Sequence, residues 1–205
     1  MKVMLVNGSP HEKGCTYTAL CEVAKALEAD GVETEIFWLG TKAIAGCRGC
    51  AACATLKKCV IDDIVNEFVE KAATADGFIF GSPVHYAAPS GAITAFMDRA
   101  FYSGGRNLRY KPAAAIVSCR RAGSSAALDV LNKYFTISCM PVVTSSYWNM
   151  VHGAKPEDVL RDDEGLQTMR TLGHNMAWLL KCLEAGKSAG VELVKEKKVY
   201  TNFIR

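Results

Sequence analysis

The sequence predicts an α/β fold in which helices cover both faces of an open parallel sheet. Short apolar runs of strand length alternate with amphipathic helical segments five times along the chain. This alternation is typical of doubly wound sheets, because each right-handed crossover lays a helix on one face. Loops rich in Gly, Pro and Ser follow the first, third and fourth predicted strands. Parallel strands bring such loops to one edge, where these sheets bind ligands.

Each element follows from a local pattern. Residues 3–6 form an apolar run typical of a buried parallel strand, and residues 32–39 alternate as a strand does. Asp30-Gly31 ends the first helix, and Asp62-Asp63 supplies a start signal for the second. The predicted strands are 3–6, 32–39, 77–80, 113–118 and 141–144. The predicted helices are 16–29, 62–73, 92–101, 126–135 and 166–183, and residues 155–165 are expected to be a solvated connection.

Size and composition favour one domain over residues 1–205, with a C-terminal helix and tail. The net charge is only +3 and no basic stretch is interleaved with aromatics, which disfavours nucleic-acid binding. No window reaches ~18 unbroken apolar residues, so no membrane segment is expected. The N-terminus is predicted to be a strand rather than a secretory signal, so a cytoplasmic location is expected. Nine cysteines in such a chain favour thiols, ligands or catalysts over disulfides.

The first loop, residues 7–15, leaves a strand and opens a helix. A helix N-terminus offers free N–H groups and partial positive charge, which favours a bound phosphate. Ser9 and Thr16 add hydroxyl groups, and His11 offers a further contact. Neither GxxxxGK[ST] nor GxGxxG is present, so this is neither an ATP loop nor a dinucleotide fingerprint. The alternative is an ordinary turn between a strand and a helix.

The second loop, residues 81–91, suits one edge of a flat heteroaromatic ring. It offers backbone amides, Tyr86 for stacking and His85 as a donor or acid. The third loop, residues 118–124, is placed to close the opposite edge. The alternatives are that His85 is a surface loop residue and that Arg120 or Arg121 is simply solvated.

A cluster of cysteines follows the second predicted strand. Cys47, Cys50, Cys53 and Cys59 are spaced CxxCxxCx5C, and this pattern favours an iron–sulfur site because three thiolates wrap a cubane and a fourth completes it. Zinc is a rival, although structural zinc prefers two separated CxxC pairs. Metal-free thiols or a redox disulfide are the third reading.

Three motifs and the cysteines together resemble a known family. The motifs are Gly-Ser-Pro-(four residues)-Cys-Thr at 8–16, Gly-Ser-Pro-Val-His-Tyr at 81–86 and Ala-Phe-Met-Asp-Arg at 95–99. The chain resembles the flavodoxin-like NAD(P)H-dependent FMN reductases over about residues 1–185. With the cysteine motif added, it is most similar to the iron–sulfur flavoprotein branch.

The resemblance implies a three-layer flavodoxin-like fold, with five parallel strands in the order 2-1-3-4-5 and a cysteine-rich loop after strand 2. It also implies noncovalent FMN, NAD(P)H as a transient donor, and a homodimer or homotetramer. Two departures are that His11 replaces a common arginine and Cys15 a common asparagine. The residues that the resemblance places on the phosphate are Ser9, His11, Cys15, Thr16 and Tyr17. Those that it places on the isoalloxazine are Pro83, Val84, His85 and Tyr86, with Ser118 and Gly123 on the far side.

We therefore expect an FMN oxidoreductase that passes electrons from NAD(P)H to a small acceptor such as a quinone or free flavin, or to a [4Fe–4S] cluster. The alternative is a non-enzymatic carrier that accepts electrons from ferredoxin. A third hypothesis is a cysteine-based redox sensor that retained the fold. The chain has no GxSxG motif, so a hydrolase has no support.

Overall fold

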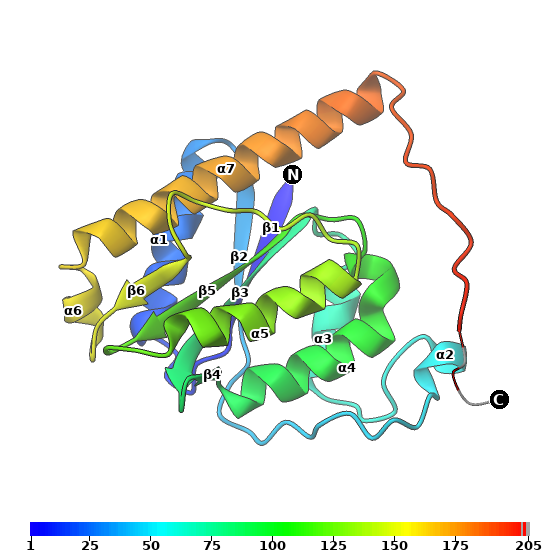
Figure 1. The fold of residues 1–205 in the computed structure, drawn as a ribbon, viewed down its shortest axis with the longest axis horizontal. Helices are drawn as coiled ribbons and strands as arrows, with labels where there is room; N and C mark the ends of the chain where they lie inside the picture. The colour runs from blue at the N-terminus through cyan, green and yellow to red at the C-terminus, as the bar shows by residue number, and fades with distance from the viewer. Residues whose placement is uncertain (202, 204–205) are drawn as a thin grey trace.

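The computed structural model describes residues 1–201 and 203, with a six-stranded sheet at its centre (Figure 1). Five strands are parallel in the order β2-β1-β3-β5-β6, and β4 pairs antiparallel with the end of β3. Apart from β4, this is the predicted order 2-1-3-4-5, which is confirmed. The strands are β1 (Lys2–Asn7), β2 (Glu33–Trp38), β3 (Gly77–His85), β4 (Ala88–Pro89), β5 (Ala113–Cys119) and β6 (Met150–His152).

Helices cover both faces of the sheet. α1 and α7 pack on one face, and α3, α4 and α5 lie on the other (Figure 1). Across residues 1–201 and 203, none of the helices has the length and apolar character that a membrane crossing needs. The helices are α1 (Cys15–Ala29), α2 (Cys53–Leu56), α3 (Ile64–Lys71), α4 (Gly91–Leu108), α5 (Ser124–Ile137), α6 (Pro156–Val159) and α7 (Asp163–Ser188).

The strands are continuously apolar because both of their faces are covered. In β1, Met4 and Val6 enter the core beneath α3, α4 and α5. Val3 and Leu5 enter the second core, beneath α1 and α7. The period of two along a strand thus divides neighbouring residues between two separate cores.

The core beneath α3, α4 and α5 is rich in aromatic rings, and Phe68 of α3 lies at its centre. Its ring centroid is 5.0 Å from that of Phe96, 5.7 Å from Phe37 and 6.0 Å from Phe78. Phe68 is fully buried. These contacts fix α3 against the sheet and against α4, and the residues just before α3 carry the last cysteine of the cluster.

The predicted fifth strand at 141–144 is correct only in part, because the run lies beside the start of β5 but does not continue as a regular strand. Only Val142 in that run makes a parallel bridge, to Ala113, and the regular strand is β6. The side chain of Asn149 donates to the Ala115 carbonyl at 3.0 Å, in the place of a backbone group. Ser145 Oγ in turn donates to Asn149 Oδ1 at 2.6 Å. These side-chain bonds hold residues 145–149 as a loop and delay regular pairing until β6.

Other boundaries also differ from the prediction. β3 continues to His85, so the first half of the predicted second loop is strand. The predicted solvated connection at 155–165 contains α6, because Val159 is buried against the second core. After α7, the chain runs back past the end of α5 toward α2 (Figure 1), where Lys198 lines the same cavity as Cys53.

Replacing Phe68 with alanine is expected to lower the free energy of unfolding by about 3–5 kcal/mol, because it opens a cavity among four other rings. Urea unfolding followed by circular dichroism measures this change. Ile137→Ala is the matched control, since Ile137 is 79% exposed and its loss should change the free energy by less than about 0.5 kcal/mol. An equal effect of the two substitutions would contradict this account of the core.

Candidate functional site

The first and second loops are joined at the carboxyl edge of the sheet. The Gly8 N–H donates to the Gly81 carbonyl at 2.8 Å, and Ser90 Oγ donates to the Gly8 carbonyl at 2.9 Å. A Cβ atom at Gly8 would lie 2.7 Å from Ile93 Cδ1, so only glycine allows this approach. The first loop therefore lies directly against the start of α4.

Side chains of the first loop shape its backbone. The Ser9 N–H donates to Asn7 Oδ1 at 3.1 Å, and the His11 N–H donates to Ser9 Oγ at 3.1 Å. Asn7 Nδ2 donates to the Glu12 carbonyl at 2.9 Å. This folded loop ends at Gly14, which has no side chain to cap α1. The first N–H groups of α1 are therefore available to an anion, as the sequence predicts.

The start of α1 also connects to the third loop. Thr16 Oγ1 and Ser118 Oγ are 2.8 Å apart and both residues are buried. The Cys15 thiol donates to the Gly153 carbonyl at 3.7 Å, and burial raises its pKa. The thiol is thus turned toward the loop after β6. Tyr17, two residues further along α1, is half-buried.

The second loop is a hairpin with an exposed tip. His85 pairs with Ala88, and the two residues between them, Tyr86 and Ala87, have φ of 51° and 59°. Two successive positive φ angles match the type I′ turn, which joins antiparallel strands with the correct twist. Glycine usually fills such positions, and other residues there cost about 1–2 kcal/mol each. This turn leaves the Tyr86 ring fully exposed.

The third loop packs against the tip of that hairpin. Gly123 has φ +86°, and a Cβ atom there would lie 2.7 Å from Ala87 Cα and 3.3 Å from Val84 Cγ1. The structure therefore brings the three predicted loops into direct contact with one another. The buried predicted residues are Ser9, Thr16 and Ser118; the half-buried ones are Cys15, Tyr17, Pro83, Val84 and Gly123; and His11, His85 and Tyr86 are exposed.

A second candidate site lies at the cysteine-rich loop after β2. Cys47, Cys50, Cys53 and Cys59 all line one cavity of about 130 Å³. Cys47 and Cys50 are exposed, and the other two are partly buried. Within the described residues, no three His, Cys, Asp or Glu side chains converge as a preformed metal site. Four thiols around one small space are nevertheless the donor set that an iron–sulfur cluster requires.

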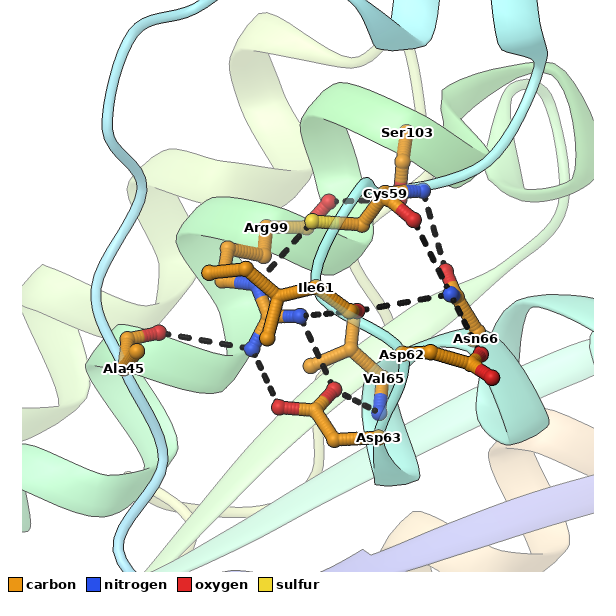
Figure 2. Close-up of polar contacts among 9 residues, drawn as sticks. All are labelled: Ala45, Cys59, Ile61, Asp62, Asp63, Val65, Asn66, Arg99 and Ser103. Carbon is orange, nitrogen blue, oxygen red and sulfur yellow. Dashed lines mark hydrogen bonds and ion pairs between the residues drawn. The ribbon is translucent and has the colours of Figure 1, made fainter.

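Arg99 of α4 lines this cavity, and its side chain is only 1% exposed. Figure 2 shows its polar contacts. Its Nε donates to Cys59 Sγ at 3.2 Å. Its two terminal nitrogens donate to the carbonyls of Ala45 at 3.4 Å and Ile61 at 2.8 Å, and to both carboxylate oxygens of Asp63. These bonds occupy all the N–H groups of the guanidinium.

Asp63 has two structural roles. Its Oδ1 accepts from the Val65 N–H at 3.1 Å and so caps the start of α3. Its two oxygens also pair with the fork of Arg99 at 2.6 and 2.9 Å. Burial alone would lower the pKa of Arg99, but the hydrogen bonds to Asp63 and Cys59 raise it above its ordinary value. The guanidinium therefore stays charged beside the cysteines.

Asn66 holds the backbone of Cys59 from the opposite direction. Its Oδ1 accepts from the Cys59 N–H at 2.9 Å, and its Nδ2 donates to the Cys59 carbonyl at 3.0 Å (Figure 2). The sulfur, the N–H and the carbonyl of Cys59 each have a partner. Cys59 is thereby fixed in place by two other elements, α3 and α4.

The sequence does not mark Arg99, Asn66 or the Asp63 ion pair as parts of a site. It predicts Asp63 only as a helix start and contains Arg99 only as part of the 95–99 motif. One sequence signal was available: Arg99 lies within a helical run whose other inward positions, Ile93, Phe96 and Ala100, are apolar. A charge on the buried face of a helix requires a partner, and such a pair often belongs to a site.

Replacing Asp63 with alanine is expected to lower the free energy of unfolding by about 3–5 kcal/mol, because it leaves the buried Arg99 charge without its partner. Loss of the cap on α3 contributes to this change. Chemical denaturation measures it, and Glu70→Ala is the control because Glu70 is an exposed carboxylate on the same helix. Equal stability of the two variants would contradict the structural role of the Arg99–Asp63 pair.

Comparisons with known proteins identify the family of the chain. A family model described as NADPH-dependent FMN reductase matches residues 1–155. The chain is 35% identical over 192 residues to an iron-sulfur flavoprotein of Methanocaldococcus jannaschii, covering 90% of this chain and 100% of that protein. It is 26% identical over 196 residues to an iron-sulfur flavoprotein of Methanosarcina thermophila, covering 91% and 99%. An archaeal flavodoxin structure gives a TM-score of 0.62 at 16% identity, covering 88% of this chain and 99% of that chain.

The flavodoxin likeness shows the fold alone. The family match covers more than half of the chain, and the Methanocaldococcus relative is similar over its whole length. The resemblance predicted from the sequence motifs is confirmed. The chain belongs to the NADPH-dependent FMN reductase family and is similar to iron-sulfur flavoproteins.

Proposed function

We propose that this protein is an FMN-dependent oxidoreductase that passes electrons from NAD(P)H to a small acceptor, and that a [4Fe–4S] cluster on Cys47, Cys50, Cys53 and Cys59 takes part. Family membership supports the flavin and the oxidoreductase class. The observation that carries the rest is that all four cysteines of the CxxCxxCx5C motif line one cavity.

The three joined loops are proposed to hold FMN. The N–H groups at the start of α1 and the hydroxyls of Ser9 and Thr16 would bind the phosphate. The hairpin residues Pro83 to Tyr86 would border the ring, with Ser118 and Gly123 completing the site. Bound FMN would supply hydride acceptance and single-electron release, while the protein orients the ring. Because Tyr86 is fully exposed, the hairpin tip is open to a transient donor.

Two features make the cysteine cavity suitable for an iron–sulfur cluster. Thiolates are the ligands that such clusters require, and the motif supplies four from one stretch of chain. Arg99 supplies a buried positive charge and an N–H donor on the inner side of the cavity. Zinc is less favoured by this arrangement because the first three cysteines overlap rather than form two separate pairs.

One helix connects the two sites. α4 begins at Gly91, directly after the hairpin, and its cap Ser90 bonds to the first loop. Arg99 lies about 12 Å further along the same helix, at 1.5 Å for each residue. The flavin loops and the cysteine cavity are therefore held at a defined separation by a rigid element.

The alternative function is a non-enzymatic electron carrier that accepts electrons from ferredoxin. The relatives named iron-sulfur flavoproteins favour this alternative, since that name describes a redox protein without a stated substrate. Steady-state oxidation of NAD(P)H discriminates the two functions. Turnover with a quinone or free flavin supports the enzyme, and its absence with fast reoxidation through ferredoxin supports the carrier.

Anaerobically purified protein is expected to contain FMN and about four irons with matching acid-labile sulfide per chain. Absorption spectra and iron and sulfide assays measure both. Cys50→Ser should lose iron and keep FMN, whereas Cys182→Ser, which changes an exposed cysteine outside the motif, should keep both. Flavin bands without iron in the wild type would overturn the cluster. Colourless protein that does not bind added FMN would overturn the whole proposal.

Gly123→Val is expected to weaken FMN binding about tenfold, or ~1.4 kcal/mol, because the new side chain would push the third loop away from its place against the hairpin. The new Cβ would also collide with Ala87 of the hairpin. Quenching of flavin fluorescence on titration gives the affinity. Gly91→Ala is the control, because a Cβ there meets no atom within 4 Å. Unchanged affinity in Gly123→Val would show that the third loop is not part of the flavin site.

A further inference from the structure

The four cysteines of the motif are not held equally. Cys47 and Cys50 are exposed in a stretch without regular secondary structure, and Cys53 begins the short helix α2. Cys59 differs because its N–H and carbonyl are bonded to Asn66, and its sulfur accepts a hydrogen bond from Arg99. The site therefore has one ligand that is already positioned and three on a looser segment.

Arg99 also anchors the two ends of that looser segment. It binds the carbonyl of Ala45, two residues before Cys47, and the carbonyl of Ile61, two residues after Cys59. The buried guanidinium thus lies between the two ends of the cysteine-bearing loop and joins them (Figure 2). Arginine suits this position because its donors lie in one plane and point in several directions.

The Nε–H group of Arg99 has a different partner from the terminal nitrogens. The ion pair with Asp63 and the two carbonyl bonds use only the terminal nitrogens. Nε points instead at Cys59 Sγ, at 3.2 Å. Because Asp63 balances the charge of Arg99, the effect on a cysteine-bound group would come mainly from this N–H donor. Hydrogen bonds to the sulfurs are one of the factors that set the potential of an iron–sulfur cluster.

We propose that Arg99 is the positioning residue of the cysteine site: it presets Cys59 as the anchoring ligand and raises the reduction potential of the bound cluster through its Nε–H···S bond. This inference rests on the proposed cluster. It adds to the proposed cluster that Cys59 is the ligand held in place and that Arg99 is the group that adjusts the reduction potential. Residues 47–53 would supply the other three thiolates, whereas Cys59 would already be held in place.

The test compares Arg99→Lys with wild type and with Arg106→Lys, a change of an exposed arginine on the same helix. Lysine keeps the positive charge near Asp63 but has no planar fork and cannot bond Asp63, both carbonyls and Cys59 together. Iron and FMN contents, the unfolding midpoint and the potential of the cluster are measured on each protein. The potential is the readout that a merely structural role would not move.

Arg99→Lys is expected to keep FMN and to bind iron about tenfold more weakly. The remaining cluster should be about tenfold harder to reduce in equilibrium terms, a shift of 59 mV to more negative potential for one electron. Arg106→Lys should match the wild type in every measurement. A wild-type potential in an Arg99→Lys protein that is folded and loaded would overturn the proposal.

A second measurement covers the case in which Arg99→Lys does not fold. Arg48 also lines the cavity, so Arg48→Lys protein labelled with ¹⁵N only at arginine Nε is reduced, and pulsed EPR records the couplings of the cluster. A coupling to arginine nitrogen is the expected result, and its absence in a loaded cluster would overturn the proposal. If the wild type binds no iron, the cluster itself is wrong, and iron assay before any spectroscopy identifies that outcome.

Discussion

The buried guanidinium of Arg99 is the constraint on which the cysteine-rich half of this structure depends. A charge that is 1% exposed is tolerated only when its donors are satisfied, and here Asp63, two carbonyls and one sulfur satisfy them. The residues between β2 and α3 have little regular structure of their own. The path of this segment is set because both of its ends, at Ala45 and Ile61, bond to the Arg99 side chain. The cap of α3, the middle of α4 and the base of the cysteine loop therefore meet at one point.

The edge of the sheet proposed to hold FMN is organised differently. Its three loops are joined by backbone contacts that exclude larger side chains, at Gly8 against Ile93 and at Gly123 against Ala87. The hydroxyl pair of Thr16 and Ser118 adds a buried connection between α1 and β5. Such close contacts hold a site with little freedom before a ligand arrives, which reduces the ordering cost of binding. α4 then links this rigid edge to the cysteine cavity.

Much of the fold was predictable because it depends on patterns along the chain. Parallel strands covered on both faces are continuously apolar, and residues 3–6 and 113–118 have that character. The spacing of Ile93, Phe96 and Met97 predicts the inner face of a helix. The sequence misplaces the regular fifth strand because the Asn149 side chain, rather than a backbone N–H, donates to the Ala115 carbonyl. The apolar run at 141–144 gives no sign of this bond. The sequence does not predict the hairpin because Tyr86 and Ala87 occupy turn positions of positive φ, where glycine is the usual residue.

The sequence by itself determined the order of elements, the placing of three Gly- and Ser-rich loops at one edge, and the spacing of four thiols, because each of these is a property of neighbouring residues. Only the tertiary structure decided which cysteine is fixed and what fixes it. Arg99 and Cys59 are 40 residues apart, and no local period relates them. Their contact exists because α3 and α4 pack side by side through Phe68 and Phe96. Burial of a charge and its pairing are long-range properties, which only the folded chain can specify.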